Sequence, residues 1–471
     1  MAVVVDTKGV AEYVARARAA QQIYEGYSQQ QVDQAVAAVG WAGFKNAETL
    51  ARLAIDETGI GNYDDKVTKN RRKTLGTLRD LKGARSVGVI REDPARGLTE
   101  IAKPVGVVAA LTPVTNPGAT AVNNVMIVLK GGNAILLAPH PMGENTCAKV
   151  VELARQALGR VGAPEDLVQY VSLRASSKEE SKRRAQALMQ QVDLALVTGG
   201  PANVRMAYSS GTPALGVGVG NAPVILDETA EIEAAADRIV QSKIFDCATS
   251  CSSENALVIQ TGIYDAVLRA LQSRGGYVVS TDEKSRLQAT MWKDGTLSRS
   301  VVAQPASTIA RLAGLAAETA LDARFLIVEE DGIGKMYPFS GEKMSPVLTV
   351  YRYTTFEDAL DKVARILDYQ GKGHSCGIHS SNDDHITRLA RAAKVSRVLV
   401  NQAHCIGNGG DFANGFDFTL SLGAGTWGGN STCDNITYRH FLNVTRLARP
   451  IPPSVPTEQE LWGDYFAKYG R

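Results

Sequence analysis

Two cysteines, Cys247 and Cys251, lie four residues apart in a run of small and polar residues that extends to Asn255. A thiolate in such a run is open to a substrate and solvated by hydroxyls and backbone N–H groups, as a nucleophile requires. A cysteine taken at random is more often a small core residue. Two other features favour Cys251 as a nucleophile: Asn116 ends a Thr-Pro-Val-Thr-Asn loop, and residues 216–221 are rich in glycine.

The elements that must position these residues alternate between strand and helix from residue 104 onward. Apolar runs predict strands at 105–111, 134–138, 167–173 and 193–198, with helices at 119–129, at 145–158 and after Ser177. The connections are long enough for parallel pairing, so we expect an α/β fold with a doubly wound open sheet. Ligands of such sheets lie beyond the carboxyl ends of the strands. These ends carry the candidate cofactor-binding residues Thr112, Pro113, His140, Thr198, Gly199 and Gly200.

A second α/β unit is expected after residue 227. A helix at 230–242 leads into the Cys251 loop, and strands are predicted at 256–259, 325–329, 347–351 and 398–401. The loop 402–418 is rich in Gly and Asn, and it opens either a cavity mouth or a subunit contact. The predicted division is a cofactor-binding domain (1–85 and 102–223), a catalytic cysteine domain (224–425), and an oligomerisation arm with a tail (86–101 and 436–471).

Lys66, Lys69 and Lys73 share one face of a predicted helix near the N-terminus. This face is interpreted as a solvated surface, with contact to a phosphate as the alternative.

The glycine-rich segments are not standard phosphate loops, because no GxGxxG follows the first strand. Gly199 and Gly200 precede a helix and can bring backbone N–H groups to a pyrophosphate, although two glycines taken alone are better explained by a plain turn. The run 216–220 precedes a strand at 224–226 instead of following one. It indicates backbone that lies close to a ligand or to the nucleophile.

Composition bounds the classes of function. The chain has 471 residues, 21% of them charged, and a net charge of +2, so neither nucleic acid nor an anionic membrane is an expected partner. No basic leader and no long apolar run are evident, and six cysteines are too few for a disulfide framework in a chain of this length. We expect a cytoplasmic protein. Cys247 and Cys251 lack the spacing of zinc ligands, and no metal is expected.

Taken together, seven motifs resemble the CoA-acylating branch of the aldehyde dehydrogenase superfamily over nearly the whole chain. They are Thr112-Pro113-(x)2-Asn116-Pro117, Ala138-Pro139-His140-Pro141, Thr198-Gly199-Gly200, Gly216-Val217-Gly218-(x)-Gly220-Asn221, Phe245-Asp246-(x)4-Cys251-(x)-Ser253-Glu254, Glu342-(x)3-Pro346 and Trp427-Gly428-Gly429-Asn430-Ser431. Each motif is modest alone, but their order and spacing are specific. The resemblance implies a Rossmann-type cofactor domain, a catalytic domain and an oligomerisation arm, in a homodimer or homotetramer.

The resemblance also implies a chemistry. Cys251 attacks an aldehyde, and the Asn116 amide and the Cys251 backbone N–H stabilise the oxyanion. Hydride passes to NADP or NAD, and coenzyme A then releases the acyl group from Cys251 as acyl-CoA. By the same resemblance, Glu342 binds the ribose on the nicotinamide side, His140 lies at the adenosine ribose, and Gly218 belongs to the cofactor site. NADP is favoured over NAD, although an imidazole at position 140 is compatible with both.

One departure from the hydrolytic branch concerns the general base. Hydrolytic enzymes carry a glutamate where this chain has Val217-Gly218-Val219-Gly220, and no acid occurs between Tyr208 and Leu226. A thiol is far more acidic than water and attacks a thioester without so strong a base. The sequence therefore predicts release to CoA instead of hydrolysis.

The substrate is the least constrained prediction. The candidate substrate-binding residues are the polar side chains Thr115, Thr249, Ser250 and His404, together with Arg205 as a possible cation. Their polarity suits an anionic group better than the methyl of acetaldehyde. Within the branch, the motifs are most similar to those of enzymes that oxidise sulfoacetaldehyde to sulfoacetyl-CoA. Succinate semialdehyde, which would use the same donors, and acetaldehyde remain alternatives.

Two other classes of function were weighed. A cysteine acyltransferase or hydrolase without nicotinamide would need a base, but His140, His374, His379, His385, His404 and His440 show no nucleophile–base signature in the sequence. Most of these histidines are interpreted as ordinary polar or core residues. A noncatalytic nucleotide-binding protein is disfavoured by the placement of Cys251 and Asn116.

Overall fold

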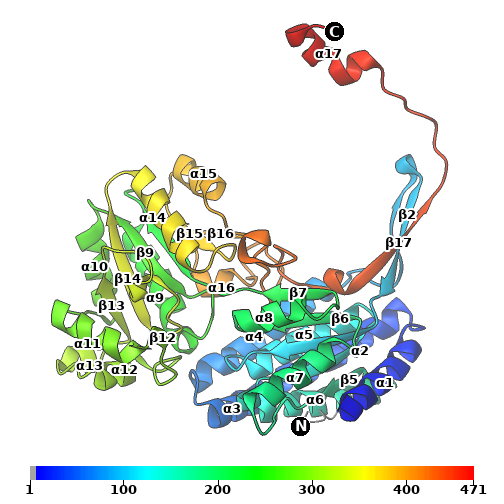
Figure 1. Ribbon diagram of the computed structural model, residues 1–471, viewed down its shortest axis with the longest axis horizontal. Helices are drawn as coiled ribbons and strands as arrows, with labels where there is room; N and C mark the ends of the chain where they lie inside the picture. The colour runs from blue at the N-terminus through cyan, green and yellow to red at the C-terminus, as the bar shows by residue number, and fades with distance from the viewer. Residues whose placement is uncertain (1–6) are drawn as a thin grey trace.

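Two parallel β-sheets form the body of the protein in the computed structural model, which describes residues 7–471 (Figure 1). The first sheet has the order β5-β4-β3-β6-β7. Its strands are β3 (Val107–Thr112), β4 (Ala134–Pro139), β5 (Val168–Tyr170), β6 (Leu194–Thr198) and β7 (Ala214–Val217). Every residue of β3 and β4 is buried, which explains why their sequences are continuous apolar runs. The four strands predicted here are confirmed, and β7, within the glycine-rich run, was not predicted.

Helices cover this first sheet. They are α1 (Thr7–Tyr24), α2 (Gln29–Lys45), α3 (Ala47–Thr58), α4 (Tyr63–Leu81), α5 (Pro117–Lys130), α6 (Glu144–Arg160), α7 (Lys178–Met189) and α8 (Pro201–Tyr208). All residues of α5 are buried, so this helix is the inner one of the layer. A capping box at Ser28 starts α2, and the αL residue Gly59 ends α3.

The second sheet has seven parallel strands in the order β10-β13-β14-β9-β8-β15-β16. The strands are β8 (Ala222–Leu226), β9 (Glu254–Gln260), β10 (Gly276–Val278), β13 (Phe325–Glu329), β14 (Val347–Tyr353), β15 (Cys376–His379) and β16 (Val398–Val400). Its helices are α9 (Ile232–Ile244), α10 (Tyr264–Gln272), α11 (Thr281–Met291), α12 (Ala306–Leu312), α13 (Glu318–Leu321), α14 (Phe356–Tyr369), α15 (Asp383–Ala392) and the short α16 (His404–Gly407). A small hairpin of β11 (Trp292–Lys293) and β12 (Thr296–Leu297) lies beside them.

The segment that follows the second sheet returns to the first. Leu422, Ile436 and Phe441 belong to the hydrophobic core of the first sheet, and Phe418 packs against Gly76 of α4. A boundary at residue 425 therefore cuts through a segment that joins the two sheets.

A three-stranded antiparallel arm projects from the body (Figure 1). It consists of β1 (Gly88–Asp93), β2 (Leu98–Pro104) and β17 (Leu442–Ala448), and a turn at Pro94–Gly97 joins the first two strands. Beyond β17 an extended segment leads to α17 (Glu458–Tyr469), which was not predicted and which stands apart from the body in Figure 1. Within residues 7–471, no helix has the length and apolar character needed to cross a membrane.

Candidate active site

A cavity of about 750 Å³ lies where the carboxyl ends of β3, β4 and β6 face the Cys251 loop. It brings together most of the candidate residues, although they come from distant parts of the chain. The candidates that line it are Thr112, Pro113, Thr115, Asn116, His140, Thr198, Gly199, Gly200, Gly218, Thr249, Ser250, Cys251 and Glu342. The cavity is thus placed as the doubly wound topology predicts.

The backbone before Cys251 is unusual. Asp246, Cys247 and Ala248 have φ angles of 49°, 51° and 57°, so three successive non-glycine residues are left-handed. This conformation costs on the order of 1–3 kcal/mol for each residue and persists only where surrounding contacts hold it. The turn ends α9 abruptly and carries the chain to Cys251 at the cavity wall.

The buried carboxylate of Asp246 supplies those contacts. It accepts hydrogen bonds from the backbone N–H of Asn62 (2.9 Å), from Lys66 Nζ (3.2 Å) and from Lys69 Nζ (2.5 Å). The two ammonium groups hold the pKa of this carboxyl below its ordinary value despite its burial. The interpretation of the lysine face as a solvated surface is therefore wrong, because Lys66, Lys69 and Lys73 are all at least nine-tenths buried.

Lys69 also fixes the orientation of the Asn116 amide. Its Nζ donates to Asn116 Oδ1 at 2.7 Å and to Thr249 Oγ1 at 2.9 Å. With the amide oxygen held by Lys69, the amide Nδ2 group remains as the donor for a ligand. This is the orientation that stabilisation of an oxyanion requires.

His374 contacts the candidate nucleophile. Its Nε2 lies 3.3 Å from Cys251 Sγ, and its Nδ1 lies 2.8 Å from Ser375 Oγ. Burial lowers the pKa of His374 well below its ordinary value, so the imidazole is neutral at pH 7. The tautomer with the proton on Nδ1 leaves Nε2 free to accept the thiol proton.

The conclusion that no histidine pairs with the nucleophile is therefore wrong for His374. This histidine is 123 residues from Cys251 in the sequence, beside Gly371 and Gly373. A side chain at Gly373 would lie 2.0 Å from the carbonyl oxygen of Ala424, so only glycine fits there. Gly371 and Gly373, next to His374, were the feature of the sequence that could have indicated closely packed backbone at this position.

The two thiols differ in position. Cys251 lines the cavity, whereas Cys247 packs among Ile60 and Ala303 outside it. Burial raises the pKa of both thiols to about 11, and for Cys251 the nearby Glu342 carboxylate adds to the effect. Glu342 is itself buried enough that its pKa rises to about 8.

The glycine-rich run lies directly against the nucleophile. A side chain at Gly220 would come within 1.9 Å of the Cys251 carbonyl oxygen, so this position requires glycine. The expectation that this backbone lies close to the nucleophile is confirmed at Gly220.

Two candidate substrate residues do not line the cavity. Arg205 is exposed on α8, whose inner face is formed by Val204 and Ala207. His404 is buried beneath the Cys251 loop, where its Nδ1 lies 2.7 Å from the Ser252 carbonyl oxygen. The prediction that Arg205 and His404 contact the substrate is therefore wrong.

Positive charge gathers at one end of the cavity. The cations that line it there are Arg174, Lys178, Lys182 and Arg299, beside His140, whose pKa is lowered by burial, and Glu342 is the one acid among the described lining residues. Gly199 and Gly200 lead into the N-terminus of α8, and space is open around Gly200. These features fit a nucleotide with its pyrophosphate at the helix and a further phosphate at the basic end.

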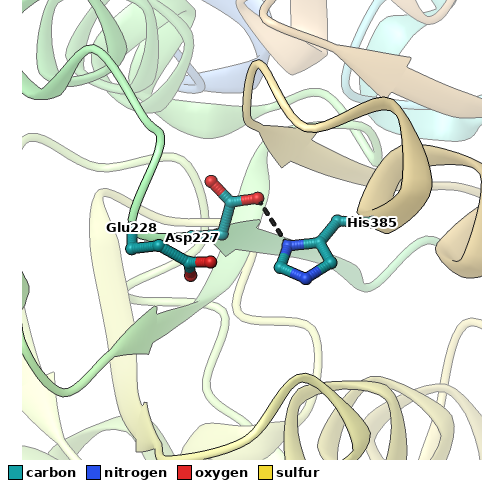
Figure 2. A group of neighbouring side chains, drawn as sticks. All are labelled: Asp227, Glu228 and His385. Atoms are coloured by element: carbon teal, nitrogen blue, oxygen red, sulfur yellow. Dashed lines mark hydrogen bonds and ion pairs between the residues drawn. The ribbon is translucent and has the colours of Figure 1, made fainter.

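A separate polar cluster lies in the second sheet, outside the cavity. Asp227, Glu228 and His385 have ligand atoms within 4.8 Å of one another (Figure 2). Asp227 already accepts hydrogen bonds from His385, Thr229 and Ser380, and the His385 ring stacks on Phe356. These bonds explain the cluster as a structural contact between β8 and α15.

Comparison with known proteins identifies the family. Residues 4–287 match the Aldehyde dehydrogenase family. An acylating sulfoacetaldehyde dehydrogenase of Cupriavidus necator is 51% identical over 98% of this chain and 94% of the relative. An acetylating succinate-semialdehyde dehydrogenase of Clostridium kluyveri is 39% identical over 96% of this chain and 99% of the relative. The chain belongs to the aldehyde dehydrogenase family, in its CoA-acylating branch.

Solved structures agree in fold. An acetylating aldehyde dehydrogenase from Geobacillus thermoglucosidasius superposes with a TM-score of 0.91 at 35% identity, covering 96% of this chain and 98% of that one. A propionaldehyde dehydrogenase of Rhodopseudomonas palustris, with bound CoA and an acylated cysteine, has a TM-score of 0.79 at 27% identity, covering 93% and 97%. An engineered glycolyl-CoA reductase with bound NADP+ has a TM-score of 0.81 at 27% identity, covering 93% and 96%.

Proposed function

We propose that this protein oxidises sulfoacetaldehyde to sulfoacetyl-CoA, with NADP+ as the hydride acceptor. The observation that carries the chemistry is that Cys251 and Asn116 line one cavity, with the buried His374 in contact with the sulfur and no acid in the segment Val217-Gly218-Val219-Gly220. The substrate follows from the 51% identical relative from Cupriavidus necator.

In the proposed reaction, Cys251 Sγ loses its proton to His374 Nε2 and attacks the aldehyde carbon. Asn116 Nδ2, oriented by Lys69, and the Cys251 backbone N–H stabilise the oxyanion. One such donor is typically worth about 3 kcal/mol in the transition state. The nicotinamide supplies a hydride acceptor, and Cys251 is left as a thioester. After His374 has released the first proton to solvent, the CoA thiol gives its own proton to His374 and attacks the thioester carbonyl, and the Cys251 thiolate leaves and takes that proton back.

The cofactor site is proposed from the first sheet. Thr112, Pro113, Gly199 and Gly200 lie at the strand ends where a dinucleotide binds in this topology. A hydrogen bond of 2.9 Å joins Thr198 Oγ1 and Ser421 Oγ and holds the carboxyl end of β6 in place. We assign Glu342 to the ribose on the nicotinamide side, with Gly218 beside it.

The preference for NADP follows from the basic end of the cavity. A 2′-phosphate adds about two negative charges, and Arg174 and Lys178 supply complementary charge. Burial lowers the pKa of His140, so this residue can offer a hydrogen bond but no charge at pH 7. Comparing kcat/KM for NADP+ and NAD+ tests this choice. We expect a preference for NADP+ that falls in a Lys178→Ala variant, and a large preference for NAD+ would contradict it.

Succinate semialdehyde is the second candidate, because the Clostridium kluyveri relative is named for it. A carboxylate and a sulfonate use the same donors, so the hydroxyls of Thr115 and Ser250 serve either anion. The Thr249 hydroxyl donates to Asp246 Oδ2 and is not a donor to the substrate. The decisive experiment measures kcat/KM for sulfoacetaldehyde, succinate semialdehyde and acetaldehyde with CoA. A clear preference for either of the last two would overturn the proposed substrate.

The arm and tail are proposed to join subunits in a homodimer or homotetramer. Both edge strands of the arm, β1 and β17, have one side without a partner strand among residues 7–471. An open strand edge is a template for pairing with another chain.

A further inference from the structure

Lys73 is a buried cation at the cavity wall. It lies on α4, one helical turn beyond Lys69, and only 9% of it is exposed. Its Nζ donates to the Gly409 carbonyl oxygen at 2.7 Å, and the side chain lines the same cavity as Cys251. Lys73 is therefore both desolvated and accessible to a ligand.

Lys73 differs from its neighbours because it has no acidic partner. Lys66 and Lys69 share the Asp246 carboxylate, and Arg72 is paired with Asp411 at 2.5 Å. Among the described residues, no carboxylate lies within 4.0 Å of Lys73 Nζ, and Gly409 O is the one hydrogen-bond acceptor that it contacts. The ammonium also lies 5.2 Å from the centre of the Phe418 ring, a cation–π contact that does not neutralise its charge. An ammonium group has three N–H donors, so two of them remain for a ligand.

An unpaired buried charge costs folding free energy, and a protein retains such a charge where a bound ligand of opposite charge pairs with it. Burial lowers the pKa of Lys73 to about 8, which still leaves the side chain mostly protonated at pH 7. The ammonium therefore offers a positive charge in a site from which water is largely excluded.

The position of Lys73 separates it from the nucleotide end. Lys69, one turn earlier on α4, contacts Asn116 and Thr249 beside the nucleophile. Lys73 lines the cavity together with Cys405 and Gly409. His140, by contrast, follows β4, and Lys178 begins α7. An aldehyde bound at Cys251 thus has Lys73 on the side of α4.

We propose that Lys73 Nζ binds the anionic group at the far end of the aldehyde, a sulfonate or a carboxylate. This inference rests on the proposed function and names the residue that selects the substrate class. A lysine suits this role because its point charge and rotatable donors match a sulfonate, whose three oxygens accept from any direction. The Ser250 hydroxyl lines the same cavity and can complete the anion site, whereas the Thr249 hydroxyl donates its hydrogen to Asp246 Oδ2 at 2.9 Å.

The test compares Lys73→Met with wild type on sulfoacetaldehyde, succinate semialdehyde and acetaldehyde, with CoA and NADP+ present. We expect kcat/KM for the favoured anionic aldehyde to fall by roughly 30-fold or more. The kcat/KM for acetaldehyde should stay within about threefold of wild type, because an uncharged methyl group gains nothing from an ion pair with the ammonium. The KM values for CoA and NADP+ should not change.

Arg71→Met is the matched control. Arg71 belongs to the same helix and carries the same charge, but it is exposed, pairs with Glu48 and does not line the cavity. This variant should keep the wild-type ratio of anionic to neutral aldehyde. If Lys73→Met does not fold, Lys73→Gln and Lys73→Arg are compared instead, and only the arginine variant should retain the preference for the anion.

Three outcomes would overturn the assignment: an equal loss on all aldehydes, an unchanged preference in Lys73→Met, or a rise in the KM for CoA alone. A sulfonate site and a carboxylate site are distinguished by which anionic aldehyde loses more. Failure of the proposed function looks different, because wild type itself would then show no preference for an anionic aldehyde.

Discussion

At Cys251 the protein must activate a thiol that its surroundings keep protonated. Burial and the Glu342 carboxylate raise the pKa of Cys251 to about 11, so little thiolate is present at pH 7. His374, neutral and 3.3 Å from the sulfur, can take the proton as the aldehyde is attacked. Because the pKa is raised, the thiolate fraction grows about tenfold per pH unit below pH 11.

This arrangement predicts how His374→Asn depends on pH. The variant should lose about 10²-fold or more of kcat/KM for the aldehyde at pH 7, since the internal base is absent. The loss should shrink toward pH 10, where bulk solvent deprotonates more of the thiol. Stopped-flow measurement of NADPH formation across pH 6.5–10 checks this, and a loss that is the same at every pH would argue against a role as base.

The two cysteines give a second prediction at this scale. Cys251→Ala should abolish formation of reduced nicotinamide, while Cys247→Ala should keep a substantial fraction because Cys247 packs outside the cavity. Steady-state assays of both variants, with folding verified by circular dichroism, provide the comparison. Equal loss in both would refute the assignment of the nucleophile.

Single residues were predictable where a local motif identified them. Cys251 and Asn116 stand in such motifs, and both line the cavity. His374 was missed because its role arises from a contact between positions 123 residues apart. Arg205 and His404 were placed wrongly because the direction of a side chain on a helix or under a loop depends on packing that the sequence does not specify.

At the scale of elements, α4 holds the catalytic loop. Its lysines bind Asp246, and Asp246 in turn holds the left-handed turn before Cys251. Lys69 links this turn to the Asn116 amide. A helix of the first sheet thereby sets the geometry of a loop of the second.

Lys69→Met tests this link. We expect kcat to fall by roughly 10-fold or more, because a charge-assisted bond that orients Asn116 is lost. If Lys69 acts through Asn116, the double variant with Asn116→Ala should be little slower than Asn116→Ala alone. Independent, multiplying losses in kcat would contradict the proposed link, and assays at 15 °C limit effects of unfolding.

The strands were predictable and the α4 face was not, for related reasons. Buried parallel strands such as β3 and β4 are apolar on both sides, so their burial can be predicted from their sequence. Lys66 and Lys69 are buried against one carboxylate that lies about 180 residues away. Periodicity showed that they share a face, but not that Asp246 covers it.

At the scale of the whole molecule, the arm and tail expose apolar surface that the body does not cover. Leu461, Trp462, Tyr465 and Tyr469 of α17 are 48% to 65% exposed. A tail of this kind is typical of a segment that packs on another subunit. The arm and tail were predicted at 86–101 and 436–471, but the sequence gave no sign of where α17 would dock.

Deletion of residues 457–471 should therefore reduce the assembly to smaller species, as measured by light scattering after size-exclusion chromatography. Trp462→Ala is the milder variant and should weaken the assembly at low protein concentration. An unchanged mass for the truncated chain across concentrations would show that the tail does not join subunits.

The central claim is that the acyl group passes through Cys251 to CoA. Mixing the protein with sulfoacetaldehyde and NADP+ without CoA, followed by mass spectrometry of the peptide that contains Cys251, tests it most directly. The account predicts about one equivalent of NADPH per active site, a sulfoacetyl adduct on Cys251, and discharge of that adduct to sulfoacetyl-CoA when CoA is added. Steady turnover to free acid without CoA, or NADPH formation with no adduct on Cys251, would contradict it.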